Sequence, residues 1–274
     1  MSWFTDRHFF SLAVVFYGVT TLYAVFLWRE GFRQHNRINY LLLFLAFGFH
    51  TLAVAGRGIS VSRCPVNNLY EAITFVAWTI VALYLVVGIW PRLQFLGAFA
   101  SPVLFAIGVF ALMPGLDPPF TGKPRFEGNW TSVHAGLILL SYGSFGLSFV
   151  AGLMYLTQEH DLKLHKLRAV FSLLPPIQRL EGIVGRLLLA GFVLLTVGLA
   201  IGAFNLRRTQ GVFYFGDSKV LWSALVWTIY FGLLMMRWGF AQTGRRFVWG
   251  AVGSFAFVLL TFWGTNLLSG IHQQ

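Results

Sequence analysis

The stretch LYEAITFVAWTIVALYLVVGIW, residues 69–90, decides the fold of this chain. Among its 22 residues only Glu71 is charged. Because about 20 consecutive apolar residues span the hydrocarbon core of a bilayer, the stretch predicts a transmembrane helix. The segment RCPVNNLYEA, residues 63–72, leads into this helix and places two asparagines, a tyrosine and a glutamate at its N-terminus. Polar residues are rare in membrane spans and tend to mark functional sites.

The rest of the chain has the same apolar character. Of its 274 residues, 57% are hydrophobic and 11% are charged, whereas about a quarter of the residues in a soluble domain are charged. No cleavage site of small residues follows the first apolar run, so we expect a retained helix there rather than a signal peptide. The sequence predicts an all-α, polytopic bundle that forms one integral membrane domain over residues 1–274. About eight spans are expected, at residues 9–28, 38–55, 69–90, 94–113, 131–157, 183–204, 220–238 and 247–268.

The charged residues indicate orientation. The formal net charge is +11, but the basic residues are scattered among the connections, which argues against nucleic acid as a partner. One set of connections carries 12 of the 20 Lys and Arg residues, namely 29–37, 91–93, 158–186 and 237–246. Since Lys-rich and Arg-rich connections remain in the cytoplasm, we expect both termini outside. The single cysteine, Cys64, allows no disulfide within the chain and no cysteine metal cluster.

The longest cytoplasmic connection, residues 158–178, has an amphipathic pattern. Four apolar residues recur in it at helical spacing, opposite three basic ones: Leu164, Leu167, Phe171 and Leu174 against Lys163, Lys166 and Arg168. Such a pattern predicts a helix on the cytoplasmic membrane surface, which Pro175 and Pro176 end. A solvated linker with one apolar face is the alternative.

Three histidines are expected at a similar depth near the outer face: His50, His134 and His272. An imidazole at that depth needs a hydrogen-bond partner or a metal. Each histidine taken alone is typical of a structural residue, but three together favour a functional site. Two imidazoles on opposite sides of a porphyrin would hold its iron. Basic partners for haem propionates are available nearby in Arg57, Arg63, Lys123, Arg125 and Lys219.

Aromatic residues make up 18% of the chain. Many of them are expected to face lipid or to form an interfacial belt. A flat macrocycle would also stack on aromatic side chains. The candidates on the outer side are Trp130, Phe213, Tyr214, Phe215, Trp222 and Trp263.

Helix capping gives a first explanation of the opening segment. Asn67 or Asn68 can cap the helix, and Pro65 sets up the turn before it. Glu71 in the first turn suits the positive end of the helix dipole. A second explanation is that these residues also line a polar vestibule near the outer surface.

Several segments together resemble a known family. PVNNLYEAITFVAW, residues 65–78, is similar to the P-x-x-N-L-Y-E-S-x-x-F-x-x-W signature of the cytochrome c assembly membrane proteins, the CcsA/ResC/CcmC group with its HemX-like and YpjD-like relatives. NWTSVHAGLILLSYGSF (129–145), GLMYLTQEHDLK (152–163) and FWGTNLLSGIHQQ (262–274) resemble further family segments, and they follow in the expected order.

The resemblance implies a haem-handling protein of the bacterial cytoplasmic membrane. It implies that b-type haem, held non-covalently, is presented at the outer face between His134 and His272. His50 is similar in place to an intramembrane histidine of some members. The full set of residues expected to bind the cofactor is His134, His272, His50, Glu71, Tyr214, Asp217 and Trp222. Apocytochrome c or a partner assembly subunit is the expected protein partner, and membrane lipid surrounds the chain.

One family feature is degenerate. A tryptophan-rich platform, W-G-x-Y-W-x-W-D-P-K-E, is expected where this chain reads QGVFYFGDSKVLW, residues 210–222. Gln210, Tyr214 and Gly216 replace its three tryptophans. The chain thus resembles the HemX-like branch, and any haem lyase (cytochrome c synthetase) activity is expected to need further subunits. A scaffold or regulator of haem biosynthesis, a haem transporter and an accessory subunit of a redox complex are the alternatives.

Overall fold

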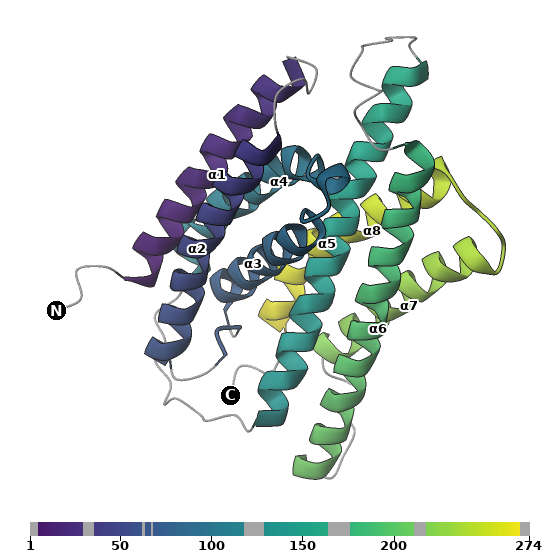
Figure 1. The fold of residues 1–274 in the computed structure, drawn as a ribbon. Helices are drawn as coiled ribbons and strands as arrows, with labels where there is room; N and C mark the ends of the chain where they lie inside the picture. Colours follow the sequence, from purple (N-terminus) through teal and green to yellow (C-terminus); the bar gives the residue numbers. More distant parts are fainter. Residues whose placement is uncertain are drawn as a thin grey trace.

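The computed structural model describes residues 5–29, 36–61, 64–66, 68–117, 129–163, 176–210 and 218–268. These residues form eight α-helices and two short 3-10 turns (Figure 1). The helices are α1 Asp6–Arg29, α2 Asn36–Val61, α3 Leu69–Val87, α4 Leu96–Ala111, α5 Asn129–Lys163, α6 Ile177–Gln210, α7 Ser218–Trp238 and α8 Arg245–Leu268. The turns are η1 Pro91–Leu93 and η2 Pro114–Leu116.

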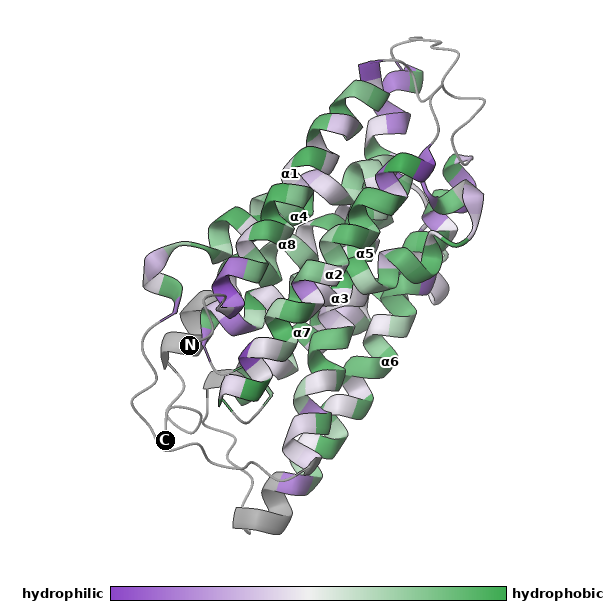
Figure 2. Cartoon of the chain, turned by 60° about the vertical axis from the view of Figure 1, so that its left-hand side comes forward, coloured by the Kyte–Doolittle hydropathy of each residue, from purple (hydrophilic) through white to green (hydrophobic). Residues whose placement is uncertain are grey.

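The all-α fold is confirmed, and the chain is a multi-pass membrane protein. Six helices are long and apolar enough to cross a bilayer: α1, α2, α3, α5, α6 and α7. The predicted spans at 94–113 and 247–268 coincide with α4, a shorter apolar helix, and with α8. Figure 2 shows hydrophobic residues along most of the helices and more hydrophilic ones toward several helix ends.

Two helices, α5 and α6, extend well beyond their predicted spans, because a count of consecutive apolar residues measures only the part that faces lipid. α5 has 35 residues and α6 has 34, against 27 and 22 in the predicted spans. Their polar ends continue the helical hydrogen bonding outside the apolar segment. Of the connection predicted as amphipathic, residues 158–163 belong to α5, and residues 164–175 lie outside the described part.

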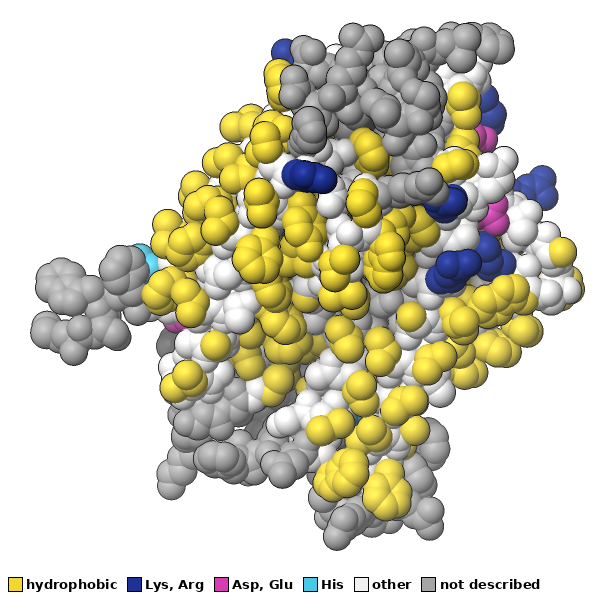
Figure 3. Space-filling view, in the orientation of Figure 1, with side chains coloured by type: hydrophobic (Ala, Val, Ile, Leu, Met, Phe, Trp, Pro, Cys, Tyr) yellow, Lys and Arg dark blue, Asp and Glu magenta, His cyan; other side chains and the backbone are white. Residues whose placement is uncertain are grey.

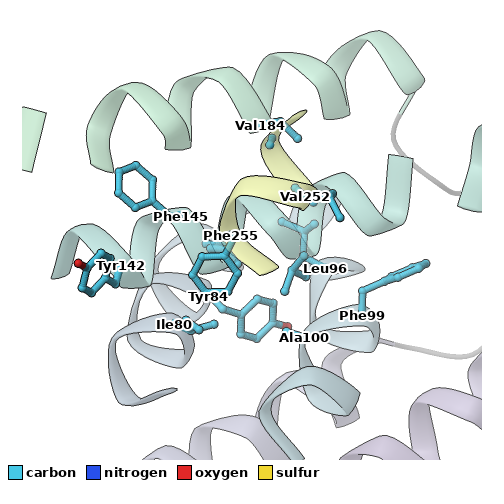
Figure 4. Close-up of a cluster of buried hydrophobic side chains, with 14 of the residues drawn as sticks. Ile80, Tyr84, Leu96, Phe99, Ala100, Tyr142, Phe145, Val184, Val252 and Phe255 are labelled. Atoms are coloured by element: carbon cyan, nitrogen blue, oxygen red, sulfur yellow. The ribbon is translucent and has the colours of Figure 1, made fainter. Parts of the chain in front are cut away.

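The centre of the bundle is formed by α3 and α5. In these two helices 61% and 72% of the most apolar window is buried inside the protein, against 39% or less in the other four long spans. α5 packs most extensively on α6, and α1 packs on α2 and α4. Figure 4 shows the core where α3, α5 and α8 meet, with Ile80, Tyr84, Phe145 and Phe255. The first and second halves of the chain are therefore joined chiefly through α3 and α5.

Close approach of α5 and α6 depends on small and hydroxylated residues. The hydroxyls of Ser144 and Ser148 donate to the carbonyls of Leu187 and Val184 across the interface, at 2.8 and 3.1 Å. Such hydrogen bonds hold membrane helices together where the hydrophobic effect cannot. Gly191 of α6 leaves room for the ring of Phe145. That ring stacks on Tyr230 of α7 with centroids 3.6 Å apart, so it has little freedom to move.

Gly191→Ala is expected to lower the free energy of unfolding by about 1–3 kcal/mol, because overpacking a filled core costs about that much. A Cβ at this position would lie 2.5 Å from the Phe145 ring. The midpoint of thermal unfolding in detergent measures the effect. Gly253→Ala is the matched control, since a Cβ at Gly253 meets nothing within 4 Å. Equal midpoints for the two variants would contradict the tight α5–α6–α7 contact.

Candidate functional site

The polar residues before α3 fold as a helix cap. Asn68 is the N-cap, and its side-chain oxygen accepts a 2.7 Å hydrogen bond from the backbone N–H of Glu71. The backbone carbonyl of Asn68 accepts from Ala72 N–H at 3.0 Å. Capping by Asn68 is thus confirmed, and Asn67 lies outside the described residues. The cap fixes where α3 begins, and so places Glu71 in its first turn.

Glu71 forms an ion pair that the sequence did not reveal. Its side chain is 0% exposed, and its carboxylate lies 2.9 Å from Nε of Arg57 near the end of α2. The guanidinium of Arg57 also meets Asp117 at 2.6 Å and Asp6 at 3.5 Å. Arg57 therefore joins three carboxylates from three different segments. This arrangement also means that Arg57, a candidate partner for haem propionates, is already engaged by protein carboxylates.

Further contacts extend this cluster across one end of the bundle. Asn68 donates to Asp117 at 2.8 Å, and Arg7 lies 3.6 Å from the same carboxylate. Both guanidinium groups lie over the ring of Tyr70, at 5.3 Å for Arg7 and 5.7 Å for Arg57. A small pocket beside Glu71 is lined by Ala53, Val54, Arg57, Pro65, Tyr70, Glu71 and Thr74. The cluster ties α1, α2, α3 and the segment after α4 together at the end where α5 begins.

His50 lies deeper in the first half of the bundle. Its side chain is fully buried, and the Tyr17 hydroxyl lies 2.9 Å from its Nδ1. The rings of Phe10 and Tyr17 pack against it, with centroids 5.0 and 6.0 Å away. The ring also lies near the backbone of Thr74, while its Nε2 makes no hydrogen bond of ordinary geometry among the described residues. α1, α2 and α3 thus enclose this imidazole.

His134 of α5 contacts a different helix, α6. Its Nδ1 lies 2.7 Å from the carbonyl oxygen of Gly198. Because a carbonyl only accepts, Nδ1 carries a proton, and in the neutral imidazole the lone pair is then on Nε2. Metal-binding histidines use this arrangement, since a backbone carbonyl on the other nitrogen fixes the tautomer and the ring orientation. In the half-buried His134, Nε2 is therefore the ring nitrogen that could bind a ligand.

A second glycine of α6, Gly202, leaves room for the ring of His134. Gly198 and Gly202 together are called the cradle of His134 below. A Cβ on Gly202 would lie 2.5 Å from Cε1 and 2.6 Å from Nδ1 of the imidazole, well inside normal contact distance. Gly198 and Gly202 have the G-x-x-x-G spacing that lets membrane helices approach closely. This spacing is visible in the sequence, and it is the signal that could have identified the cradle before the structure.

Of the other expected site residues, Trp222 is described and three are not. Trp222 is buried near the start of α7, with its ring 5.6 Å from Phe257 of α8 and with Tyr142 of α5 beside it. It therefore lies between α5, α7 and α8. His272, Tyr214 and Asp217 lie outside the described residues, so their expected roles stay predictions. His50 contacts residues of α1, and His134 contacts α6, so the described contacts do not bring the two histidines together.

Comparisons with known proteins agree with the sequence motifs. Residues 66–272 match the family described as Cytochrome C assembly protein. The chain is 26% identical to Protein HemX of Brevibacillus brevis over 224 residues, which cover 82% of each protein. It is 28% identical to Cytochrome c biogenesis protein CcsA of Prochlorococcus marinus over 248 residues, 82% of this chain and 79% of the relative. Identity to the protein of the same name from Guillardia theta is 24%, over 81% of this chain and 80% of that relative.

Arg57→Gln would leave the carboxylate of Glu71 buried beside a neutral side chain. We expect a loss of about 3 kcal/mol in the free energy of unfolding, the usual cost of breaking one side of a buried pair. Thermal unfolding in detergent measures it. The double variant Arg57→Gln/Glu71→Gln should recover part of the loss.

Arg7→Gln is the control for that measurement. Arg7 lies 3.6 Å from Asp117, and its side chain is 39% exposed. A pair of this kind contributes about 1 kcal/mol or less. Equal losses in the Arg7 and Arg57 variants would show that the cluster does not depend on the buried pair.

Gly202→Ala should displace the imidazole of His134 and break its hydrogen bond to Gly198. NMR of the protein labelled with ¹⁵N-histidine distinguishes the two nitrogens, and His134→Ala assigns the signal. We expect an Nδ1-protonated ring in the parent protein and loss of that signature in Gly202→Ala. Gly136→Ala, where a Cβ meets nothing within 4 Å, should leave the signal unchanged. An unaltered signal in Gly202→Ala would refute the cradle.

Proposed function

Because the chain belongs to the cytochrome c assembly protein family, we propose that it handles haem in c-type cytochrome biogenesis. In this proposal His134 and His272 would hold b-type haem non-covalently at the outer membrane face. The observation that carries it is the 2.7 Å contact between His134 Nδ1 and the Gly198 carbonyl, which leaves Nε2 of the neutral ring as the nitrogen that would bind iron. A resident haem fits this donor, since neutral imidazole is a common haem ligand.

The α5–α6 pair performs the positioning. The Gly198 carbonyl accepts a hydrogen bond from Nδ1 of His134, and Gly202 leaves the space that the ring occupies. His272 would supply the second imidazole, and Tyr214, Asp217 and Trp222 would contact the macrocycle or its edge. Bound haem supplies an iron centre and vinyl groups to which cysteine thiols can be added. The share of this chain is orientation, which alone can contribute a large part of a rate enhancement.

Glu71 enters the proposal as a positioning residue. Its carboxylate is turned to Arg57, so it acts on haem through the ion cluster that fixes the ends of α1, α2 and α3. His50 acts from within the same three helices, where Tyr17 orients its ring. Substitution of Glu71 or His50 would therefore act on haem binding indirectly, by changing the arrangement of α1, α2 and α3 at the outer end of the bundle.

The setting is the bacterial cytoplasmic membrane, with both termini outside and residues 158–178 on the cytoplasmic surface. Apocytochrome c or a partner assembly subunit would meet the haem from the outside. The platform segment 210–222 lacks the three tryptophans of the family pattern. We therefore propose that any haem lyase activity requires a partner and does not reside in this chain alone.

A second candidate is a membrane scaffold or regulator of haem biosynthesis. Two observations favour it. The chain is 26% identical to a protein named HemX over 82% of its length. The same loss of tryptophans at Gln210, Tyr214 and Gly216 separates it from the synthetase pattern.

The absorption spectrum of the purified protein tests the first function against the second. In the parent protein we expect a low-spin haem absorption signal typical of two imidazole ligands. In both His134→Ala and His272→Ala we expect this signal to be weaker or to become high-spin. His160→Ala, at the far end of α5, is the control and should keep the parent spectrum. A folded protein that takes up no haem after reconstitution would reject haem presentation and favour the scaffold.

A further inference from the structure

The first turns of α6 lie at the level of lipid headgroups. Residues 187–205 contain no charged side chain, and at 1.5 Å per residue these 19 residues cover about 28 Å, close to the thickness of the hydrocarbon core. Residues 177–186 precede them in the same helix. They carry two exposed arginines, Arg179 and Arg186, which must therefore stand in the headgroup layer.

The two arginines lack acidic partners among the described residues. In the described part of this end of α5–α8 there are six basic and three acidic residues: Lys163, Arg179, Arg186, Arg237, Arg245 and Arg246 against Glu159, Asp161 and Glu181. Glu181 is engaged by Arg237 at 3.2 Å. Glu159 is shared between Lys163 at 2.7 Å and Arg245 at 3.5 Å. Figure 3 shows dark-blue Lys and Arg side chains gathered at the upper right of this face, beside a largely hydrophobic surface.

Arg179 and Arg186 share one face of α6 because they are seven residues, or nearly two turns, apart. Their Cα atoms are separated by about 10.5 Å along the axis. Gly182 lies between them on this face, and a Cβ there would meet nothing within 4 Å. The two arginines thus stand on either side of an open stretch of helix surface at Gly182, and their Cα spacing leaves room for a phosphate between them.

The same face continues into the membrane as an exposed apolar strip. Leu189, Val193 and Val197 are 37%, 51% and 46% exposed, and they follow Arg186 at helical spacing. A ligand that fits this surface is anionic at one end and has a hydrocarbon chain at the other. Exposed Trp238 and Phe240 at the end of α7 are typical of residues at the headgroup level.

We propose that Arg179, Gly182 and Arg186 bind the headgroup of one anionic phospholipid, whose acyl chain lies along the strip. The guanidinium groups supply paired hydrogen bonds to the phosphate oxygens, and the gap at Gly182 admits the phosphate. This site is independent of the proposed haem function.

Native mass spectrometry in detergent tests the site, with phosphatidylglycerol and phosphatidylcholine of identical acyl chains as probes. We expect one phosphatidylglycerol to bind more tightly than phosphatidylcholine. Arg179→Gln/Arg186→Gln should weaken that binding about 30-fold, which corresponds to about 1 kcal/mol for each arginine. Gly182→Leu keeps both charges but fills the gap, and it should weaken binding as well.

Arg29→Gln/Arg37→Gln is the matched control, since it removes two exposed arginines from the same end of the bundle but from α1 and α2. It should leave phosphatidylglycerol binding unchanged, and unchanged unfolding midpoints should verify the fold of each variant. Equal binding of both lipids, or an equal loss in the control, would overturn the proposal in favour of diffuse charge. Displacement of the lipid by inorganic phosphate at similar concentration would overturn it in favour of a free anion site.

Discussion

Within a bilayer no water is available to a buried polar group, so each such group must find its partner inside the protein. The guanidinium of Arg57 supplies such a partner to three carboxylates. It satisfies Glu71, which is 0% exposed, and it also reaches Asp117 and Asp6. Without this cation, three carboxylates from separate segments would repel one another at one end of the bundle. The ends of α1, α2, α3 and the segment after α4 are held in place because they share it.

The same constraint explains what the sequence could predict. Apolar length alone located eight helices, of which six are long and apolar enough to cross a bilayer. Helices are favoured there because lipid tolerates only segments that satisfy their own backbone, and α3 begins at Leu69 after its cap at Asn68. The partners of the polar residues were harder to predict. Arg57 precedes Glu71 by 14 residues, and Tyr17 precedes His50 by 33, so neither pair leaves a helical spacing to detect. Helix lengths were underestimated for α5 and α6, because polar residues at their ends remain helical beyond the lipid.

For the candidate haem site, the residue types were predictable and the supporting contacts were not. His134 stood out as a polar residue at the start of an apolar span. Nothing in its own segment pointed to Gly198, which lies 64 residues further along and fixes its tautomer. For Glu71 the structure adds a partner that the sequence did not predict, Arg57, and its expected role toward the cofactor stays a prediction. The family match over residues 66–272 links these features to cytochrome c assembly.

The unbroken course of α6 has a mechanical consequence. One helix of 34 residues carries Arg179 at one end and Gly202, which shapes the seat of His134, near the other. An uninterrupted helix tilts as a rigid rod when the surrounding bilayer becomes thinner or thicker. Because Ser144 and Ser148 of α5 are hydrogen-bonded to the backbone of α6, the two helices are expected to tilt together. The headgroup end of α6 and the seat of His134 therefore belong to one mechanical unit, whose tilt would follow the thickness of the membrane.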